Sequence, residues 1–185
     1  MPYPAQITRE LVIDKACALI EAEGLDQVSL SRLAAALNVK APSLYRYFDG
    51  KGELLRAVNA ATGHLLIASI SEAVAVAQSA REQVIAMAFA YRAFAHRFPV
   101  TFGLLFSDLT ADLRPDAAQS EQWVLPLQAV MAELAGESES LAALRGAMAL
   151  AHGYVTLELN GQFRRGGDLD TTFARIVEAY INGWQ

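Results

Sequence analysis

The chain has 185 residues and a formal net charge of −5, and 54% of its residues are hydrophobic while 19% are charged. This composition excludes a disordered chain, and the length is enough for one large domain or two small ones with a buried core. The longest stretch without a charged residue, 57–71, is broken by polar side chains and is shorter than the roughly 18 residues that cross a bilayer. The first six residues have neither a basic start nor a following apolar block, which is not typical of a secretory signal, and the sequence contains a single cysteine, Cys17. We therefore expect a cytoplasmic protein without a membrane span, a disulfide or a structural zinc site.

The charge is unevenly distributed along the chain. Residues 1–58 hold seven basic and seven acidic side chains, which leaves eight basic and thirteen acidic ones for the remainder. Within 27–56, five basic residues stand against two acidic ones. This segment can carry a small basic face, although a solvated helix surface would explain the same count. The negative total argues against a nonspecific nucleoid-associated protein.

Every strongly patterned segment has the period of an α-helix, which predicts an all-α fold. The first helix should begin after Thr8 as N-cap and end at Gly24 in a Schellman motif. A second, short helix should begin after Ser29 and end near Asn38, a residue that tolerates left-handed backbone.

A third short helix is predicted over 41–48, with Pro42 in its first turn. A helical projection places Leu44 and Phe48 together and leaves a polar, basic and aromatic face on the opposite side. Two short helices of this kind are what a helix-turn-helix needs to place side chains in a major groove. A small helical hairpin without that role shows a similar pattern.

The remaining elements are all predicted to be helical. We expect helices over 53–77, 81–98, 121–135 and 138–165, a helical turn at 100–106, an Asp-rich loop over 109–120 and a last helix capped by Asp170. The apolar stripe of the last helix is too wide for one neighbouring helix, which predicts a second copy of the chain as partner. The predicted interface consists of Ala143, Gly146, Ala147, Leu150, Tyr154, Leu157, Phe173, Ile176, Val177, Tyr180, Ile181 and Trp184.

One run of residues carries a family resemblance. The segment Leu37-Asn38-Val39-Lys40-Ala41-Pro42-Ser43-Leu44-Tyr45, followed by Phe48 and Lys51, resembles the reader domain of the TetR (tetracycline-repressor-like) transcriptional regulators, and the likeness covers about residues 8–58. It implies a helix-turn-helix DNA-binding domain over 1–58 and a helical ligand-binding and dimerisation domain over 59–185. The residues expected to contact DNA are Ser29, Ser31, Arg32, Lys40, Ala41, Pro42, Ser43, Tyr45, Arg46, Tyr47 and Lys51.

The resemblance also implies individual roles. Ser29 would cap its helix toward a phosphate, a set of four side chains would face bases, and Tyr45 and Lys51 would hold the DNA backbone. The four are Ala41, Pro42, Ser43 and Tyr47. For Tyr45 and Tyr47, half-buried packing against the first helix is the alternative.

This chain departs from the family pattern at two positions. Lys40 stands where the family usually has a Ser or Thr cap, and Ala41 offers only a methyl group. Base contacts would therefore depend on thymine methyl groups and on Arg46. Residues 151–159 resemble the histidine-glycine segment of one TetR subgroup.

The second part of the chain has the size and apolar character of a sensor for a small molecule. The candidate ligand residues are Phe89, Arg92, Phe102, Phe106, Trp123 and His152. The alternatives are an ion-paired or rim position for Arg92 and core packing for His152 and the aromatic residues. The sequence shows no catalytic motif and no metal-ligand spacing, so we expect no catalytic residue, metal or cofactor.

These observations predict a ligand-responsive transcriptional regulator, most simply a repressor. It would bind a palindromic double-stranded DNA operator as a homodimer and be released by a small apolar or aromatic effector, without a membrane partner. The alternative is a helical small-molecule carrier or enzyme in which residues 1–58 only cap the bundle. Such a protein would show no sequence preference on DNA.

Overall fold

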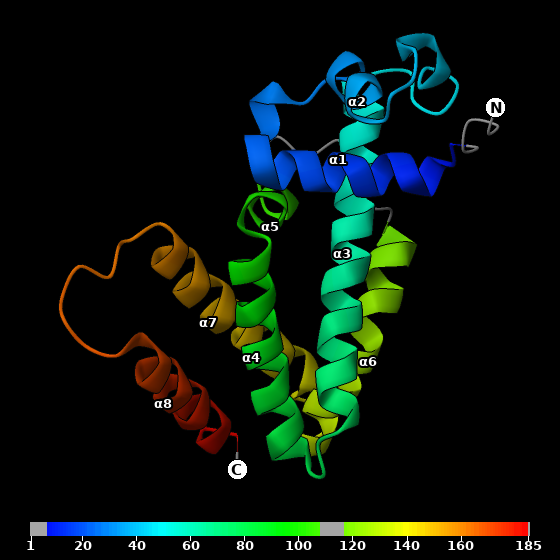
Figure 1. The fold of residues 1–185 in the computed structure, drawn as a ribbon. Helices are drawn as coiled ribbons and strands as arrows, with labels where there is room; N and C mark the ends of the chain where they lie inside the picture. Colours follow the sequence, from blue (N-terminus) through cyan, green and yellow to red (C-terminus); the bar gives the residue numbers. More distant parts are fainter. Residues whose placement is uncertain (1–6, 108–116, 185) are drawn as a thin grey trace. The chain divides into compact units, whose positions relative to one another are not determined.

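The computed structural model describes residues 7–107 and 117–184, and all regular secondary structure in this part of the chain is helical, with no strand (Figure 1). The α-helices are α1 (Arg9–Glu23), α2 (Leu30–Ala36), α3 (Lys51–Ala75), α4 (Ala80–Arg97), α5 (Pro99–Leu105), α6 (Ala117–Ala135), α7 (Ser140–Leu159) and α8 (Leu169–Asn182). Two 3₁₀ helices, η1 (Leu25–Gln27) and η2 (Ala41–Ser43), lie between them. The all-α prediction is confirmed. Most of the predicted loop 109–120 lies outside the described residues.

The described residues form two compact units. The first holds residues 7–64 and 98–107, and the second holds residues 65–97 and 117–184. One boundary falls inside α3, between His64 and Leu65. The first unit therefore contains α5 in addition to the segment 1–58 that the sequence marked as a DNA-binding domain.

The first two helices begin where the sequence predicts. The Thr8 hydroxyl accepts a hydrogen bond from the Leu11 N–H at 3.2 Å, and the Ser29 hydroxyl accepts one from the Arg32 N–H at 3.1 Å. Each side chain satisfies a backbone donor that the first turn of a helix leaves without a partner. Both predicted N-caps are confirmed.

The ends of these helices differ in type. Asn38 has the left-handed backbone that we expected (φ 54°), and the Val39 N–H returns to the Ala34 carbonyl at 2.9 Å, as in a Schellman motif. Gly24 also ends its helix, with φ 84° and ψ 160°. This ψ lies outside the left-handed helical region, so the Schellman motif predicted at Gly24 is wrong, and the chain turns into η1 instead.

Residues 41–48 are wound more tightly than predicted. Only η2 is regular, and the following turns include hydrogen bonds from the Leu44 N–H to the Ala41 carbonyl and from the Tyr47 N–H to the Leu44 carbonyl, three residues apart. Pro42 contributes no N–H, and the segment is too short for α-helical bonds to accumulate before Asp49 and Gly50. The segment still places its side chains as a single short turn of helix would.

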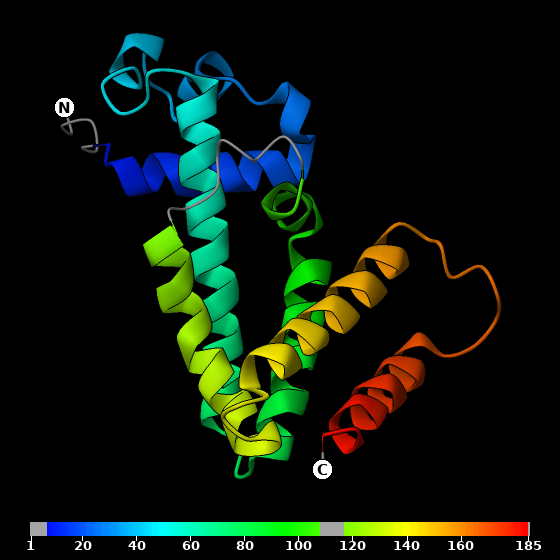
Figure 2. The same cartoon turned by 180° about the vertical axis from the view of Figure 1, so that it is seen from behind.

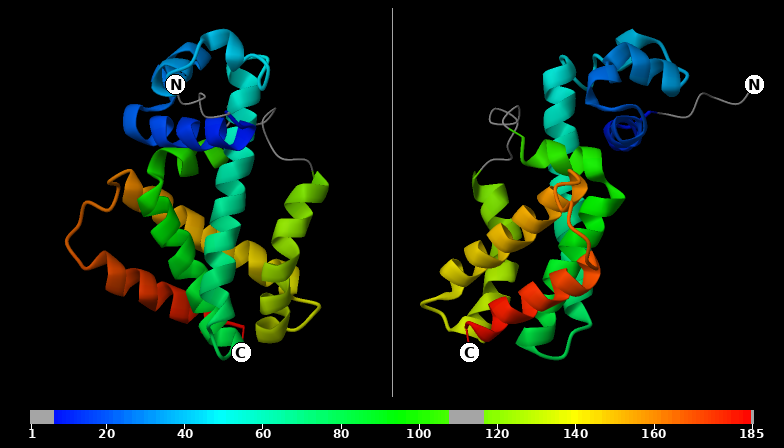
Figure 3. Two further views of the ribbon diagram at one scale, coloured as in Figure 1. Left: turned by 45° about the vertical axis from the view of Figure 1, so that its right-hand side comes forward. Right: turned by 90° about the vertical axis from the view of Figure 1, so that its left-hand side faces the viewer.

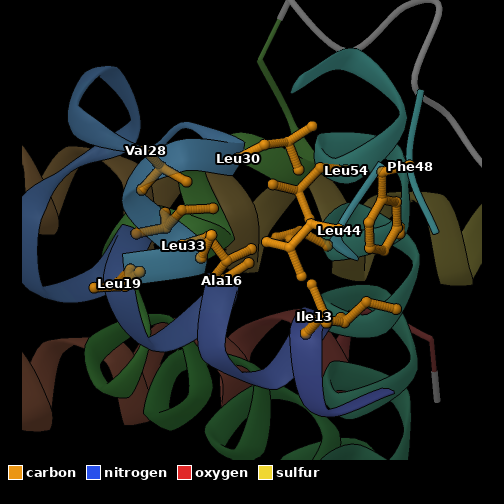
Figure 4. Close-up of a cluster of buried hydrophobic side chains, with 14 of the residues drawn as sticks. Ile13, Ala16, Leu19, Val28, Leu30, Leu33, Leu44, Phe48 and Leu54 are labelled. Atoms are coloured by element: carbon orange, nitrogen blue, oxygen red, sulfur yellow. The ribbon is translucent and has the colours of Figure 1, made fainter. Parts of the chain in front are cut away.

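An apolar core fixes this turn against the first helices. Leu44 and Phe48 are fully buried and point toward Ile13, Leu33 and Leu54, which come from α1, α2 and α3 (Figure 4). The predicted inner face of residues 41–48 is thus confirmed. Because Leu44 and Phe48 are both large and buried, the opposite side of the turn is held toward solvent.

α5 is attached to α1 by a carboxylate. Glu21 accepts hydrogen bonds from the Val100 N–H at 3.1 Å, the Thr101 N–H at 2.7 Å and the Thr101 hydroxyl at 2.5 Å. Phe98, the N-cap residue of α5, provides no side-chain cap. Glu21 therefore caps a helix that lies 79 residues further along the chain.

In the second unit, α6 leads through a short turn into α7, and the two helices pack together (Figure 2). α7 ends at Leu159, not at 165 as predicted. The Gln162 N–H bonds to the Leu157 carbonyl and Gly161 has φ 62°, which is a Schellman ending. Gly161, which we assigned to the helix, is the sequence signal for this stop.

A long connection then leads to α8 (Figure 3). The N-cap of α8 is Asp168, whose carboxylate accepts from the Thr171 N–H at 2.5 Å. The predicted cap, Asp170, lies inside the first turn and pairs with Arg92 instead. α8 packs against both α4 and α7.

α3 is the one helix among the described residues that is long and apolar enough to cross a membrane by length and composition, and 44% of its most apolar window is buried. Core helices of water-soluble proteins pass the same test. Leu54 and Val58 of α3 are fully buried in the first unit, so at least part of its apolar surface is used in packing.

Candidate nucleic-acid interface

Most of the predicted DNA-contacting residues lie at α2 or on the turn over 41–48, and Lys51 begins α3. Of the eleven, eight are exposed and three are half-buried. The exposed ones are Ser29, Ser31, Arg32, Lys40, Pro42, Tyr45, Arg46 and Lys51, and the half-buried ones are Ala41, Ser43 and Tyr47. α2 and η2 contact one another, so the residues on these two elements lie close together in the first unit.

Tyr45 and Arg46 are neighbouring exposed residues on the turn. Tyr45 is 54% exposed. The Arg46 guanidinium lies 5.7 Å from the centroid of the Tyr47 ring, which is a cation–π distance, and its Nε is 3.5 Å from the Ser43 carbonyl. Neither contact neutralises its charge, so Arg46 remains able to bind an anion or the edge of a guanine.

Tyr47 and Lys51 make contacts inside the protein. The Tyr47 hydroxyl donates to the Ile7 carbonyl at 2.5 Å, which fixes the chain just before α1. The Lys51 ammonium donates to the Leu25 carbonyl at 3.0 Å. Tyr47 is half-buried, as the alternative predicts, and its base-facing role stays a prediction. Lys51 keeps its full charge, because a carbonyl does not neutralise it.

Arg32 is paired with an acidic residue. Its Nε and one terminal nitrogen contact the two carboxylate oxygens of Glu23 at 3.1 and 2.5 Å. Glu23 is not among the predicted site residues, because its partner lies nine positions away on another helix. No local pattern reveals such a pair.

The second unit contains a half-buried charge cluster around Arg92. The Arg92 side chain, 12% exposed, contacts Glu158 at 2.5 Å and Asp170 at 2.6 Å, and Glu158 also accepts from His96 at 3.0 Å. The hydrogen bonds from Arg92 lower the pKa of Glu158 to about 2. Arg92 thus has two acidic partners, as the ion-pair alternative predicts. A lone acid within the apolar run 157–159 was the signal for its partner.

The other predicted ligand residues are packed in different surroundings. His152 Nδ1 lies 2.9 Å from the Tyr91 hydroxyl, and burial lowers the pKa of His152 and raises that of Tyr91. Phe89 meets Phe173 edge to face, with centroids 5.3 Å apart. In the first unit, the rings of Phe102 and Phe106 pack together. Trp123 of α6 is half-buried.

A hollow with a volume of about 450 Å³ lies at the connection between α7 and α8. Its lining includes none of the six predicted ligand residues. The lining residues are Tyr154, Gln162, Phe163, Arg164, Arg165, Gly166, Gly167, Leu169 and Thr172. No group of three His, Cys, Asp or Glu side chains within 7–107 and 117–184 is arranged to hold a metal. Burial raises the pKa of Cys17 to about 11, which leaves it a protonated thiol.

Five of the twelve predicted interface residues are buried within the chain itself. They are Ala143, Tyr154, Phe173, Val177 and Ile181. The Tyr180 hydroxyl bonds to the Ala143 carbonyl and lies against Gly146. Our premise that α8 has one neighbour is wrong, because α8 contacts both α4 and α7. The large apolar residues that α7 leaves exposed are Leu157, which belongs to the predicted set, and Leu141 and Met148, which do not; the last two are 41% and 52% exposed.

Comparison with known proteins shows which family the chain belongs to. Residues 12–58 match the family of bacterial regulatory proteins called the tetR family, and residues 84–180 match the tetracyclin repressor-like C-terminal domain. This chain belongs to the TetR family. It is a helix-turn-helix transcriptional regulator, and the family is not one of enzymes, so the enzyme alternative is excluded.

Both the related sequences and the solved structures described next are similar to this chain over nearly all of its length. An uncharacterized HTH-type transcriptional regulator, Rv0681 of Mycobacterium tuberculosis, is 32% identical over 91% of this chain and 76% of its own length. A protein of unknown function from Rhodococcus sp. RHA1 superposes with a TM-score of 0.80 at 22% identity, covering 100% of this chain and 98% of that one. A variant of TetR from Acinetobacter baumannii AYE, solved in complex with minocycline, has a TM-score of 0.67 at 20% identity and 96% coverage of both chains. Membership of the histidine-glycine subgroup stays a prediction.

Proposed function

We propose that this TetR-family regulator is a homodimeric repressor in the cytoplasm, and that it binds a near-palindromic DNA operator through its first unit. The observation that carries the proposal is the anchored turn over 41–48. Leu44 and Phe48 are buried while Pro42, Tyr45 and Arg46 are exposed, so the turn presents a fixed row of groups outward. Such a turn beside α2 is the arrangement that enters a major groove in helix-turn-helix proteins.

The polar groups on this surface suit two kinds of DNA contact. Tyr45 and Lys51 can hold phosphates, which positions the protein without reading sequence. Arg46 can read the acceptor edge of a guanine, while Pro42 and Ala41 offer apolar contact to a thymine methyl group. Two protomers would read two half-sites about one helical turn or more apart.

The test is selection of bound duplexes from a random DNA pool at moderate salt, followed by sequencing. We expect a palindromic motif for the wild type. Arg46→Ala should relax the preference at one position of each half-site, whereas Tyr45→Ala should weaken binding to all duplexes about equally. Arg164→Ala, which removes an exposed arginine from the second unit, is the matched control. A well-folded protein that enriches no motif would refute the proposal.

Dimerisation would use the exposed apolar side of α7. Leu141 and Met148 lie two helical turns apart on one face of that helix. Leu141→Glu combined with Met148→Glu should give monomers in sedimentation velocity and weak operator binding. Val76→Glu, at a residue that is 77% exposed, is the control and should remain a dimer. A dimeric double variant would contradict this assignment.

A small apolar or aromatic effector would bind in the second unit and release the operator. The minocycline complex of a structural neighbour supports such a ligand class for the proposal. A panel of aromatic compounds that includes minocycline should contain one that lowers operator affinity. By linkage, the operator must lower the affinity for that compound by the same factor. A compound that binds in the second unit without changing DNA affinity would contradict the mechanism for that ligand.

A further inference from the structure

The Arg32–Glu23 contact lies at the edge of the proposed DNA-binding surface. Arg32 follows Ser29, whose hydroxyl caps α2, by three positions, and both side chains of the pair are accessible to solvent, at 44% for Arg32 and 29% for Glu23. The guanidinium uses two nitrogens on one edge to contact both carboxylate oxygens, at 3.1 and 2.5 Å. This two-point geometry is the strongest form of such a pair.

The pair removes one positive charge from this surface. A basic side chain that already faces a carboxylate has no unbalanced charge with which to displace a counterion from DNA. Lys51, whose partner is a carbonyl, and Arg46, whose neighbour is an aromatic ring, keep their charge. Arg32 therefore differs from them, although all three are exposed residues of the first unit.

A phosphate would have to compete with Glu23 for Arg32. The guanidinium edge that holds the carboxylate is the edge that binds a phosphate or a guanine in the same two-point manner. If a phosphate took that edge, the Glu23 carboxylate would be left without its cation beside the negative DNA backbone. This repulsion favours the internal pair.

We propose that Glu23 limits the affinity of this protein for DNA by holding Arg32 in an internal ion pair in place of a phosphate contact. The inference rests on the proposed function, because it assumes that DNA lies against α2 and the turn over 41–48. Glu23 lies outside the set of predicted DNA-contacting residues. In this proposal it nevertheless sets how tightly the surface binds any duplex.

The test measures binding of full-length protein to a fluorescent random-sequence duplex at several salt concentrations. In Glu23→Gln, Arg32 regains its charge and can bind one further phosphate. The slope of log affinity against log salt should steepen by about 0.9, which corresponds to about eightfold tighter binding at 0.1 M salt and about threefold at 0.3 M. Exposed ion pairs contribute little to stability, so the variant should keep its helical circular dichroism.

A double-mutant cycle separates the effect of the Arg32–Glu23 pair on DNA affinity from the effects of the two single residues. Arg32→Gln leaves Glu23 unpaired and should weaken binding, whereas Glu23→Gln with Arg32→Gln restores the neutral pair and should bind within about twofold of wild type. Glu72→Gln removes the same charge from an exposed site in the second unit and should leave the slope unchanged.

Two results would overturn the proposal and leave the proposed function intact. If Glu23 instead orients Arg32 toward DNA, Glu23→Gln will bind duplexes no more tightly than wild type, and that outcome refutes our assignment. A double variant as weak as Arg32→Gln also refutes it, since Arg32 would then contribute a contact of its own. If neither wild type nor Glu23→Gln binds any duplex at low salt, the proposed function itself fails and the inference fails with it.

Discussion

Glu21 offers the sharpest test of how the first unit is held together. Its carboxylate accepts three hydrogen bonds from Val100 and Thr101, and it is the cap of α5. Glu21→Gln keeps the shape of the side chain but replaces one oxygen with an NH₂ group, which cannot accept from a backbone N–H. One charge-assisted hydrogen bond contributes about 1.5–3 kcal/mol, and the charge at the helix N-terminus adds about 0.3–1 kcal/mol. On this basis we expect a loss of about 2 kcal/mol.

Hydrogen exchange measured by mass spectrometry can locate this loss. About 2 kcal/mol corresponds to roughly thirtyfold more frequent opening of α5, since every 1.4 kcal/mol is a factor of ten. The peptide that contains Val100 and Thr101 should exchange faster in Glu21→Gln, while peptides from α7 should not change. Glu72→Gln, an exposed residue of α3, is the matched control. If the two variants protect α5 equally, Glu21 is not its cap and the reasoning is wrong.

Three further predictions concern single contacts. Gly146→Ala would place a Cβ 2.6 Å from the Tyr180 hydroxyl, so it should cost about 1–2 kcal/mol in urea unfolding despite the better helix propensity of Ala. Adding Tyr180→Phe removes this closest contact but also the hydrogen bond to the Ala143 carbonyl, so it should recover only part of the loss. The pKa of Glu158 is about 2 in the folded protein against 4.5 ordinarily, so the stability that its carboxylate contributes is complete above pH 4.5 and is lost as the pH falls toward 2. Between these pH values the wild type should therefore lose more stability than Glu158→Gln, as measured by tryptophan fluorescence. Tyr47→Phe loses the hydrogen bond to the Ile7 carbonyl, so it should lower the free energy of unfolding in urea by about 1 kcal/mol. The selected DNA motif should stay unchanged, and an altered motif would show that the Tyr47 hydroxyl contacts a base.

Local signals in the sequence predicted much of the first unit. Thr8 and Ser29 are caps in fact, and Asn38 has the left-handed backbone that its side chain tolerates. Each of these depends on a hydroxyl or backbone group within four residues, so a short window of sequence contains both partners. The buried side of the turn at Leu44 and Phe48 follows from the same short-range periodicity.

The missed features depend on partners far apart in the chain. Glu21 caps a helix 79 residues away, and Arg92 finds Glu158 66 residues away. Glu158 stands out as a charge between two leucines, but neither neighbourhood shows which distant residue is the partner. The start of α8 shows a different limit, because Asp168 and Asp170 are equally good caps by residue type, and only the ion pair with Arg92 decides between them.

The composition of the first unit has a consequence for its modularity. Leu104 is 4% exposed and belongs to the same apolar core as Leu33 and Leu44, although α3 and α4 separate it from them in the sequence. The ribosome must therefore make more than half of the protein before this core can close. A gene fusion that borrows only residues 1–58 would omit Leu104 and the helix that Glu21 caps. Exchange of reader domains between regulators of this kind should succeed when α5 is transferred together with the N-terminal segment.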